Sequence, residues 1–323
     1  MQRITYRDSG GRIVRGLPFK RVPEALKDAG GLLWIDMCDP SEAEWRKVLV
    51  DTFDFHPLAV EDAIQDVNHP KIDDYGDYLY LAVHGVRMDI ASRLLRSEEL
   101  DIFLGANYII TFHSAPNSGI DQSLLSMSKD DRRLRFAPDM FLACMLEQVM
   151  DMYMSLMESM DQELEVVEDE VLKKSGPEML ERIIDLRHSI SNLRRTLSPQ
   201  REMLGRLSRS DFRLINEKSR PYFRDVYDQS VRTLDIVESG RDLAAGLLEV
   251  HLTVISNKLN DIMRVLMVVS VIIMPLTLIS GIYGMNLKIL PMANHDWGFL
   301  GVMGLMAAVA GGLALYFKKK RWL

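Results

Sequence analysis

Residues 265–283 read VLMVVSVIIMPLTLISGIY and are followed at once by Gly284-Met285-Asn286. The run carries no charge and is about as long as a helix must be to cross a bilayer core. A second uncharged run, residues 297–317, follows a connecting stretch at 287–296, and its many glycines and alanines favour close helix packing. The C-terminal part of the chain therefore predicts two transmembrane helices joined by a loop.

Basic residues predict how these helices cross the membrane. Only Lys288 lies in the connecting stretch, whereas Lys258, Arg264 and the tail Lys318-Lys319-Lys320-Arg321 flank the two runs at their other ends. The positive-inside rule then places both chain termini in the cytoplasm. Residues 287–296 become an extracytoplasmic loop, and 318–323 become a basic cytoplasmic tail.

The rest of the chain has the composition of a soluble protein. The chain has 323 residues and a net charge of −7, and its charged residues are concentrated before about residue 260. Residues 1–11 are polar and lack the apolar core of a signal peptide, so we expect this body to stay in the cytoplasm. Cys38 and Cys144 are the only cysteines, which excludes a disulfide framework and predicts two reduced thiols.

Residues 1–135 predict an α/β domain. Four apolar segments, at 31–36, 78–83, 100–104 and 108–112, have the length and composition of buried strands. Asp39 or Ser41 is a candidate cap for a helix between the first two strands, and His56-Pro57 begins a second candidate helix.

Residues 136–220 change to a helical pattern. Many acidic residues and no lysine or arginine lie between 136 and 172, Gly176-Pro177 breaks the pattern, and 178–209 is rich in arginine. An acidic helix followed by a basic one predicts an antiparallel hairpin with complementary faces. The acidic face is either simply solvated or concentrates divalent cations near a pore. From 221 the helical pattern continues to 283, as a cytoplasmic stalk (221–264) and then the first membrane helix (265–286).

One stripe of this long helix holds most of its polar and small residues. They recur every three or four positions, which is the spacing of one helical face: Asn260, Met263, Met267, Ser270, Met274, Thr277, Gly281 and Gly284. Two helices per chain cannot enclose a water-filled path, so conduction would need an oligomer in which each subunit contributes this helix. The alternative is that Ser270, Thr277 and Gly281 are ordinary helix-packing residues.

Together these features resemble the CorA-type magnesium transporters. Tyr283-Gly284-Met285-Asn286 matches the signature of that family, and it stands between two terminal apolar runs with a basic tail. Met274-Pro275-Leu276-Thr277 and PYFRDVYD at 221–228 are also similar to the family. The resemblance implies a funnel-shaped homopentamer in the plasma (inner) membrane, with cytoplasmic α/β domains, long stalk helices and two membrane helices per subunit.

The resemblance also implies roles for individual residues. Gly284, Met285 and Asn286 would form the outer pore entrance, and six further residues would line or gate the pore: Asn260, Met263, Met267, Met274, Thr277 and Gly281. The implied function is influx of Mg²⁺, with Co²⁺ and Ni²⁺ as further candidates, closed by cytoplasmic Mg²⁺ through negative feedback. Regulatory ions would bind Asp225 together with Asp89 from the next subunit, and Glu249 at a second site.

Two other functions stay open on the sequence. One is a zinc transporter of the same superfamily, although Met285 in the signature argues against that branch. The other is a membrane-anchored sensor of divalent ions. The loop departs from the family pattern, since Met292 stands where an acidic residue is common and leaves only Asp296 there. An enzyme or a nucleic-acid partner is not expected, because the chain shows no nucleophile–base pair, phosphate-binding glycine loop or metal-ligand motif.

Overall fold

The computed structural model of the protein describes residues 2–65, 69–88, 95–114, 116, 118–173, 176–209, 212–285, 297–320 and 322. The chain forms two compact units, Met1–Leu248 and Glu249–Leu323. The strands are β1 Gln2–Arg7, β2 Ile13–Arg15, β3 Leu32–Cys38, β4 Lys71–Asp74, β5 Tyr78–Met88, β6 Leu95–Gly105 and β7 Tyr108–His113. The helices are α1 Val22–Ala25, α2 Glu42–Trp45, α3 Pro57–Ile64, α4 Gly119–Lys129, α5 Pro138–Val171, α6 Pro177–Arg209, α7 Arg220–Tyr283 and α8 Gly298–Lys319.

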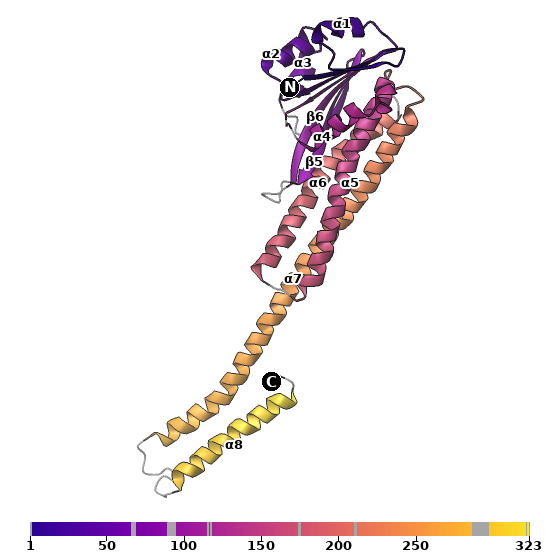
Figure 1. Cartoon of the computed structure of the whole chain (residues 1–323). Coiled ribbons are helices and arrows are strands. Elements are labelled where there is room, and N and C mark those ends of the chain that lie inside the picture. Colours follow the sequence, from indigo (N-terminus) through magenta and orange to yellow (C-terminus); the bar gives the residue numbers. More distant parts are fainter. Residues whose placement is uncertain are drawn as a thin grey trace. The chain divides into compact units, whose positions relative to one another are not determined.

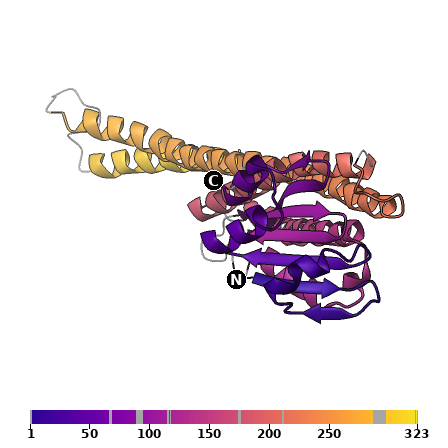
Figure 2. The same ribbon diagram turned by 90° about the horizontal axis from the view of Figure 1, so that it is seen from above.

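The first unit is built on one seven-stranded sheet in the order β2-β1-β3-β7-β6-β5-β4 (Figure 2). Neighbouring strands are antiparallel except β3 and β7, which are parallel and pair Cys38 with His113 at their carboxyl ends. The four predicted strands are confirmed as β3, β5, β6 and β7. The prediction missed β1, β2 and β4, because these strands lie at or beside the sheet edges and contain few buried residues.

Helices cover both faces of this sheet (Figure 1). Successive side chains of a strand point to opposite faces, so Leu33 and Ile35 belong to the core beneath α1 and α3, while Trp34 belongs to the other core. That second core is larger and includes residues of α4, α5, α6 and the first part of α7. Burial on both faces explains why the central strands read as almost continuous apolar runs.

The two short helices after β3 begin where the sequence indicated. Ser41 caps α2, since its backbone N–H and hydroxyl both donate to Glu44 Oε2, at 2.9 and 3.0 Å. Asp39 is not the cap, because it takes a left-handed backbone conformation (φ 44°) before the helix begins. His56 caps α3 by accepting a hydrogen bond from the backbone N–H of Leu58.

The helical hairpin pairs opposite charges across its two helices. From α6, Arg182 Nη2 contacts Glu163 Oε1 of α5 at 2.6 Å, and Arg182 Nη1 contacts Glu170 Oε2 at 2.9 Å. Arg182 thus links the basic helix to two acidic residues of the helix before it. These pairs are partly exposed, so we expect each to stabilise the hairpin by no more than about 1 kcal/mol.

Helix α7 runs without a break from Arg220 to Tyr283, as the sequence predicted, with Pro275 inside it. Both α7 and α8 contain a segment long and apolar enough to cross a membrane, and only 6% of each such segment is buried. Apolar helix surface that the chain itself leaves uncovered must be covered by lipid or by other subunits. The finer division of the chain at residues 135, 220, 264, 286, 296 and 317 stays a prediction.

Candidate functional site

The six residues predicted to line or gate the pore all lie on the exposed surface of α7. Met263 and Met274 are 63% and 72% exposed, values that are unusual for large apolar side chains in a folded chain. Asn260, Met267, Thr277 and Gly281 are exposed as well. Because α7 is one regular helix, their spacing of three and four places them along a single stripe.

The hydroxyl groups in this stripe are satisfied within the helix. Ser270 Oγ donates to the carbonyl of Leu266 at 2.8 Å, and Thr277 Oγ1 donates to the carbonyl of Ile273 at 3.0 Å. A hydroxyl that donates to its own helix can lie in a low-dielectric environment without an unsatisfied proton. Its oxygen lone pairs can still accept hydrogen bonds from the water around an ion.

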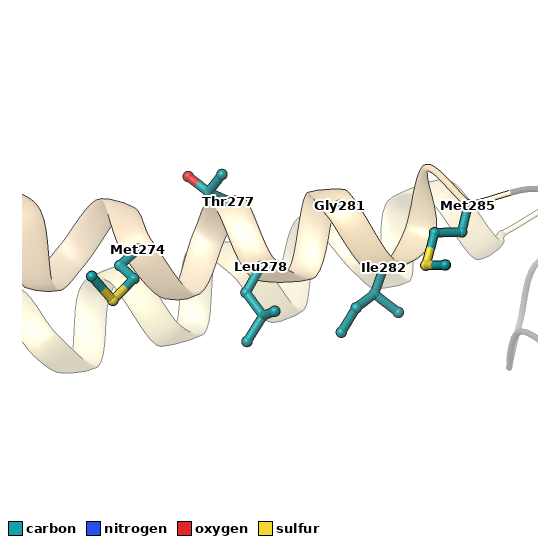
Figure 3. Close-up of a pocket in the computed structure, with 6 residues that line it drawn as sticks. All are labelled: Met274, Thr277, Leu278, Gly281, Ile282 and Met285. Carbon is teal, nitrogen blue, oxygen red and sulfur yellow. The ribbon is translucent and has the colours of Figure 1, made fainter.

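The outer end of α7 carries a shallow hollow in its surface (Figure 3). The residues that line it are Met274, Thr277, Leu278, Gly281, Ile282 and Met285. In Figure 3, the side chain of Thr277 points to one side of the helix and the side chain of Leu278 points to the opposite side. The hollow thus lies between the stripe that contains Thr277 and an apolar side of the helix that contains Leu278 and Ile282. Gly281 has no side chain to fill the hollow.

The signature sequence follows directly on the end of this helix. Gly284 N donates to the carbonyl of Ser280 at 2.9 Å, and Met285 N donates to the carbonyl of Ile282 at 3.2 Å, so hydrogen-bonded turns continue beyond the end of α7. Asn286 and the connecting stretch 287–296 lie outside the described residues. Their predicted roles stay predictions.

The predicted regulatory acids are only partly described. Asp225 and Glu249 are both exposed on α7, where carboxylates are accessible to ions. Glu249 lies about seven helical turns further along the same helix than Asp225, so one chain cannot bring the two onto one ion. Their roles as regulatory ligands stay predictions. Asp89, the expected partner of Asp225, lies outside the described residues.

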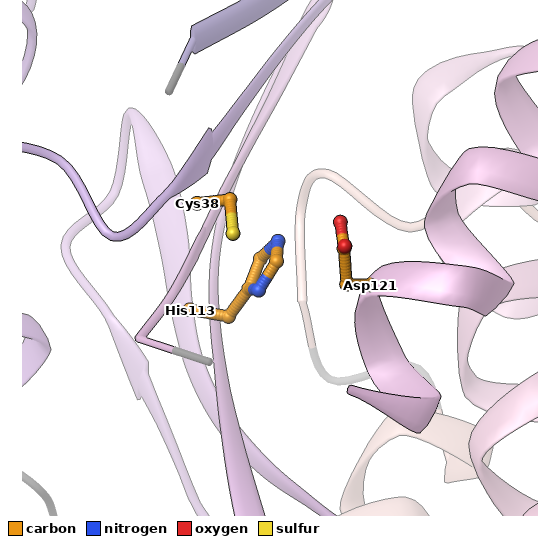
Figure 4. A group of neighbouring side chains, drawn as sticks. All are labelled: Cys38, His113 and Asp121. Atoms are coloured by element: carbon orange, nitrogen blue, oxygen red, sulfur yellow. The ribbon is translucent and has the colours of Figure 1, made fainter. Parts of the chain in front are cut away.

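The structure also brings together a set of potential metal ligands that the sequence did not indicate. Cys38 ends β3, His113 ends β7 and Asp121 lies in the first turn of α4, and their side chains face one another (Figure 4). Burial raises the pKa of the Cys38 thiol, which therefore stays protonated in the absence of a metal. No spacing motif signals this cluster, because its members come from distant parts of the chain. Cys144, half-buried in α5, is not part of it.

Comparison with known proteins identifies the family. Residues 29–319 match the family described as CorA-like Mg²⁺ transporter protein. The cobalt/magnesium transport protein CorA of Thermotoga maritima is 33% identical over 300 residues, which cover 92% of this chain and 85% of that protein. The zinc transport protein ZntB of Pectobacterium carotovorum is 20% identical over 294 residues, or 90% of this chain and 87% of that protein.

A solved structure shares the fold along nearly the whole chain. The CorA magnesium transporter from Methanocaldococcus jannaschii superposes with a TM-score of 0.85 at 23% identity, covering 99% of this chain and 98% of that one. An α/β body, a long helix and two C-terminal apolar helices are common to both. The chain therefore belongs to the CorA-like Mg²⁺ transporter family and is a membrane transporter of divalent metal ions.

Proposed function

We propose that the protein is a homo-oligomeric channel through which Mg²⁺ enters the cytoplasm, with Co²⁺ and Ni²⁺ as further candidate ions. The observation that carries the proposal is the exposed stripe of polar, small and methionine residues on α7, which leads without interruption to Gly284-Met285. In a ring of subunits this stripe lines the central path. The ring has five members by resemblance to the family.

The chemistry of the stripe suits a strongly hydrated ion. Mg²⁺ gives up its water reluctantly, so neutral oxygen atoms that bind its hydration shell can select it and still release it. Asn286 supplies such oxygens at the outer entrance, and Thr277 and Asn260 supply polar rings deeper in the path. Met263 and Met274 form apolar constrictions, which stop conduction when water leaves them.

Gating follows from ion binding outside the membrane helices. Mg²⁺ bound by Asp225 and Asp89 across a subunit interface, and by Glu249 at a second interface site, holds the ring closed. When the cytoplasmic concentration falls and the ions leave, repulsion between these carboxylates loosens the ring. This arrangement requires cytoplasmic termini, which the basic residues 318–321 favour in a plasma (inner) membrane.

A zinc transporter is the second candidate. It is favoured by the likeness to ZntB over 90% of this chain. Met285 within the signature favours Mg²⁺ over Zn²⁺ as the transported ion. A sensor that only anchors itself in the membrane is a third possibility, and it predicts no ion flux at all.

The test is ion uptake into liposomes that contain the purified full-length protein. We expect Mg²⁺ uptake by the parent and none by Asn286→Ala. Asn294→Ala, a control asparagine from the connecting stretch that follows the signature, should take up Mg²⁺ like the parent. All three proteins must first elute as the same oligomer. Absence of Mg²⁺ uptake after internal Mg²⁺ has been chelated refutes the magnesium channel, and Zn²⁺ uptake then separates the zinc transporter from the sensor.

A further inference from the structure

The carboxyl ends of β3 and β7 meet the start of α4 in a buried cluster of metal-ligating side chains. Cys38 and His113 are directly paired across the two parallel strands, and Asp121 follows the helix cap Ser118. One ligand atom from each residue lies within 4.8 Å of the other two (Figure 4). Cys38, His113 and Asp121 are only 3%, 2% and 4% exposed.

The imidazole of His113 is an unusual member of this cluster. Neither of its ring nitrogens has a hydrogen-bond partner among the described residues, although the ring is almost completely buried. Nε2 lies 3.3 Å from Asp36 Oδ1 without forming a hydrogen bond to it, and that carboxylate accepts hydrogen bonds from Arg3 and from the hydroxyl of Thr111. A buried polar group without a partner is costly, and a missing ion is one of its common explanations.

We propose that Cys38, His113 and Asp121 bind one transition-metal dication of the Zn²⁺ class in the cytoplasmic unit. A thiolate and an imidazole select Zn²⁺, Co²⁺ or Ni²⁺ over Mg²⁺, which prefers oxygen ligands. This site is therefore distinct in chemistry from the transport path and from the carboxylates proposed to regulate it. The fourth coordination position falls to Asp36 or to water.

The charges of the cluster balance when the ion is bound. Asp36 and Asp121 contribute two negative charges and Arg3 one positive charge, which leaves one negative charge when the thiol is protonated. Binding transfers the thiol proton of Cys38 to solvent and forms the sulfur–metal bond, so the thiolate adds a second negative charge. The dication then neutralises the site, and Arg3 does not have to leave.

Binding of the ion requires only a small movement of the three side chains. Ligand atoms around a tetrahedral Zn²⁺ lie about 3.5 Å apart, given metal–ligand bonds of roughly 2.0–2.3 Å. The cluster closes with side-chain movements of about 1 Å. Once bound, the ion links two strands to α4 and stabilises this part of the unit.

The experiment uses Co²⁺ as a spectroscopic probe of the full-length protein in detergent. The protein is stripped with chelator, supplied with excess Mg²⁺ to fill oxygen-ligand sites, and titrated with Co²⁺. We expect a thiolate-to-cobalt charge-transfer band that saturates at one Co²⁺ per chain and disappears when Zn²⁺ displaces the cobalt. Cobalt in an all-oxygen transport path gives no such band, so the result does not depend on whether the protein conducts Mg²⁺.

The two cysteines provide a matched pair of variants. Cys38→Ser should lose the band, and Cys144→Ser should keep it. At 100-fold excess over its Kd, Zn²⁺ should raise the melting temperature of the parent and of Cys144→Ser by about 5–10 °C, and leave Cys38→Ser unchanged. His113→Asn keeps both thiols, and it should weaken Co²⁺ binding at least about tenfold.

Three results would overturn the proposal. They are no charge-transfer band in the folded parent, a band that survives in Cys38→Ser, and unchanged Co²⁺ affinity in His113→Asn. If Cys38→Ser does not fold, the comparison of His113→Asn with Cys144→Ser decides the question.

Discussion

Replacing Arg3 with methionine isolates the contribution of a partly buried cation to the first unit. Arg3 Nε donates to Asp36 Oδ2 at 2.7 Å, and Arg3 Nη2 donates to Asp121 Oδ1 at 2.5 Å. Burial acts to lower the pKa of Arg3, but its hydrogen bonds and the charges of Asp121 and Asp36 outweigh burial and raise that pKa. Methionine preserves most of the apolar stem and leaves two carboxylates facing each other.

The expected loss of stability follows from the burial of the three groups. The side chains of Asp36 and Asp121 are 3% and 6% exposed, whereas that of Arg3 is 21% exposed. Breaking a fully buried ion pair costs about 3–5 kcal/mol, and the partial exposure of Arg3 places this case at the lower end, about 3 kcal/mol. A unit of roughly this size loses about 2–4 °C of melting temperature per kcal/mol, so we expect a decrease of about 6–12 °C.

Tryptophan fluorescence during thermal unfolding is the appropriate assay. Trp34 Nε1 donates to Thr111 Oγ1 at 3.1 Å, and Thr111 Oγ1 donates to Asp36 Oδ1 at 2.7 Å, so this indole reports directly on the affected network. Chelator must be present, to exclude any contribution from bound metal. The matched control is Arg15→Met, because Arg15 pairs with Asp131 on the surface, where the two side chains are 44% and 61% exposed.

Arg15→Met should lower the melting temperature by at most about 4 °C, since an exposed pair contributes roughly 0–1 kcal/mol. Equal shifts for Arg3→Met and Arg15→Met would refute the reasoning from burial.

Two further predictions concern the proposed gate and the packing of glycines. Met274→Ala should increase Mg²⁺ flux at high internal Mg²⁺, because it widens an apolar constriction. Met303→Ala on α8 is the control and should leave this flux unchanged. Equal flux from the two variants would exclude a gate at Met274. Gly105→Ala should destabilise the first unit by about 1–3 kcal/mol, because a Cβ there would lie 2.1 Å from the ring of Tyr108. Gly246→Ala, with no atom within 4 Å of the added Cβ, should instead stabilise α7 by about 1 kcal/mol, and a thermal melt of both variants distinguishes the two signs.

The sequence predicted those elements whose signal is contained in a short stretch of chain. The long helix through Pro275 to Tyr283 and the apolar helix that follows are defined by composition over consecutive residues. The cap at Ser41 is a local hydrogen-bonding pattern, so the sequence could name it as one of two candidates. The helix start at His56-Pro57 could be predicted for the same reason. The strands with continuous apolar runs were also predicted, because their composition over consecutive residues is a local signal.

Strands with less apolar composition were missed. In β1 only Ile4 and Thr5 are buried, and its other residues are partly exposed. Such a strand is stabilised by pairing with β3, which lies far along the chain, and not by its own pattern. The predicted pore stripe was a different case, because helical spacing alone shows that its residues share one face.

The sequence by itself determined the two apolar helices, the stripe on the first of them and the family signature that follows it. Helix period and hydrophobicity are local properties, and they need no knowledge of tertiary contacts. Only the tertiary structure decided that Cys38, His113 and Asp121 share one buried site with Asp36 and Arg3. Parallel pairing of β3 with β7 brings the ends of these distant strands together, and no spacing along the chain encodes that pairing.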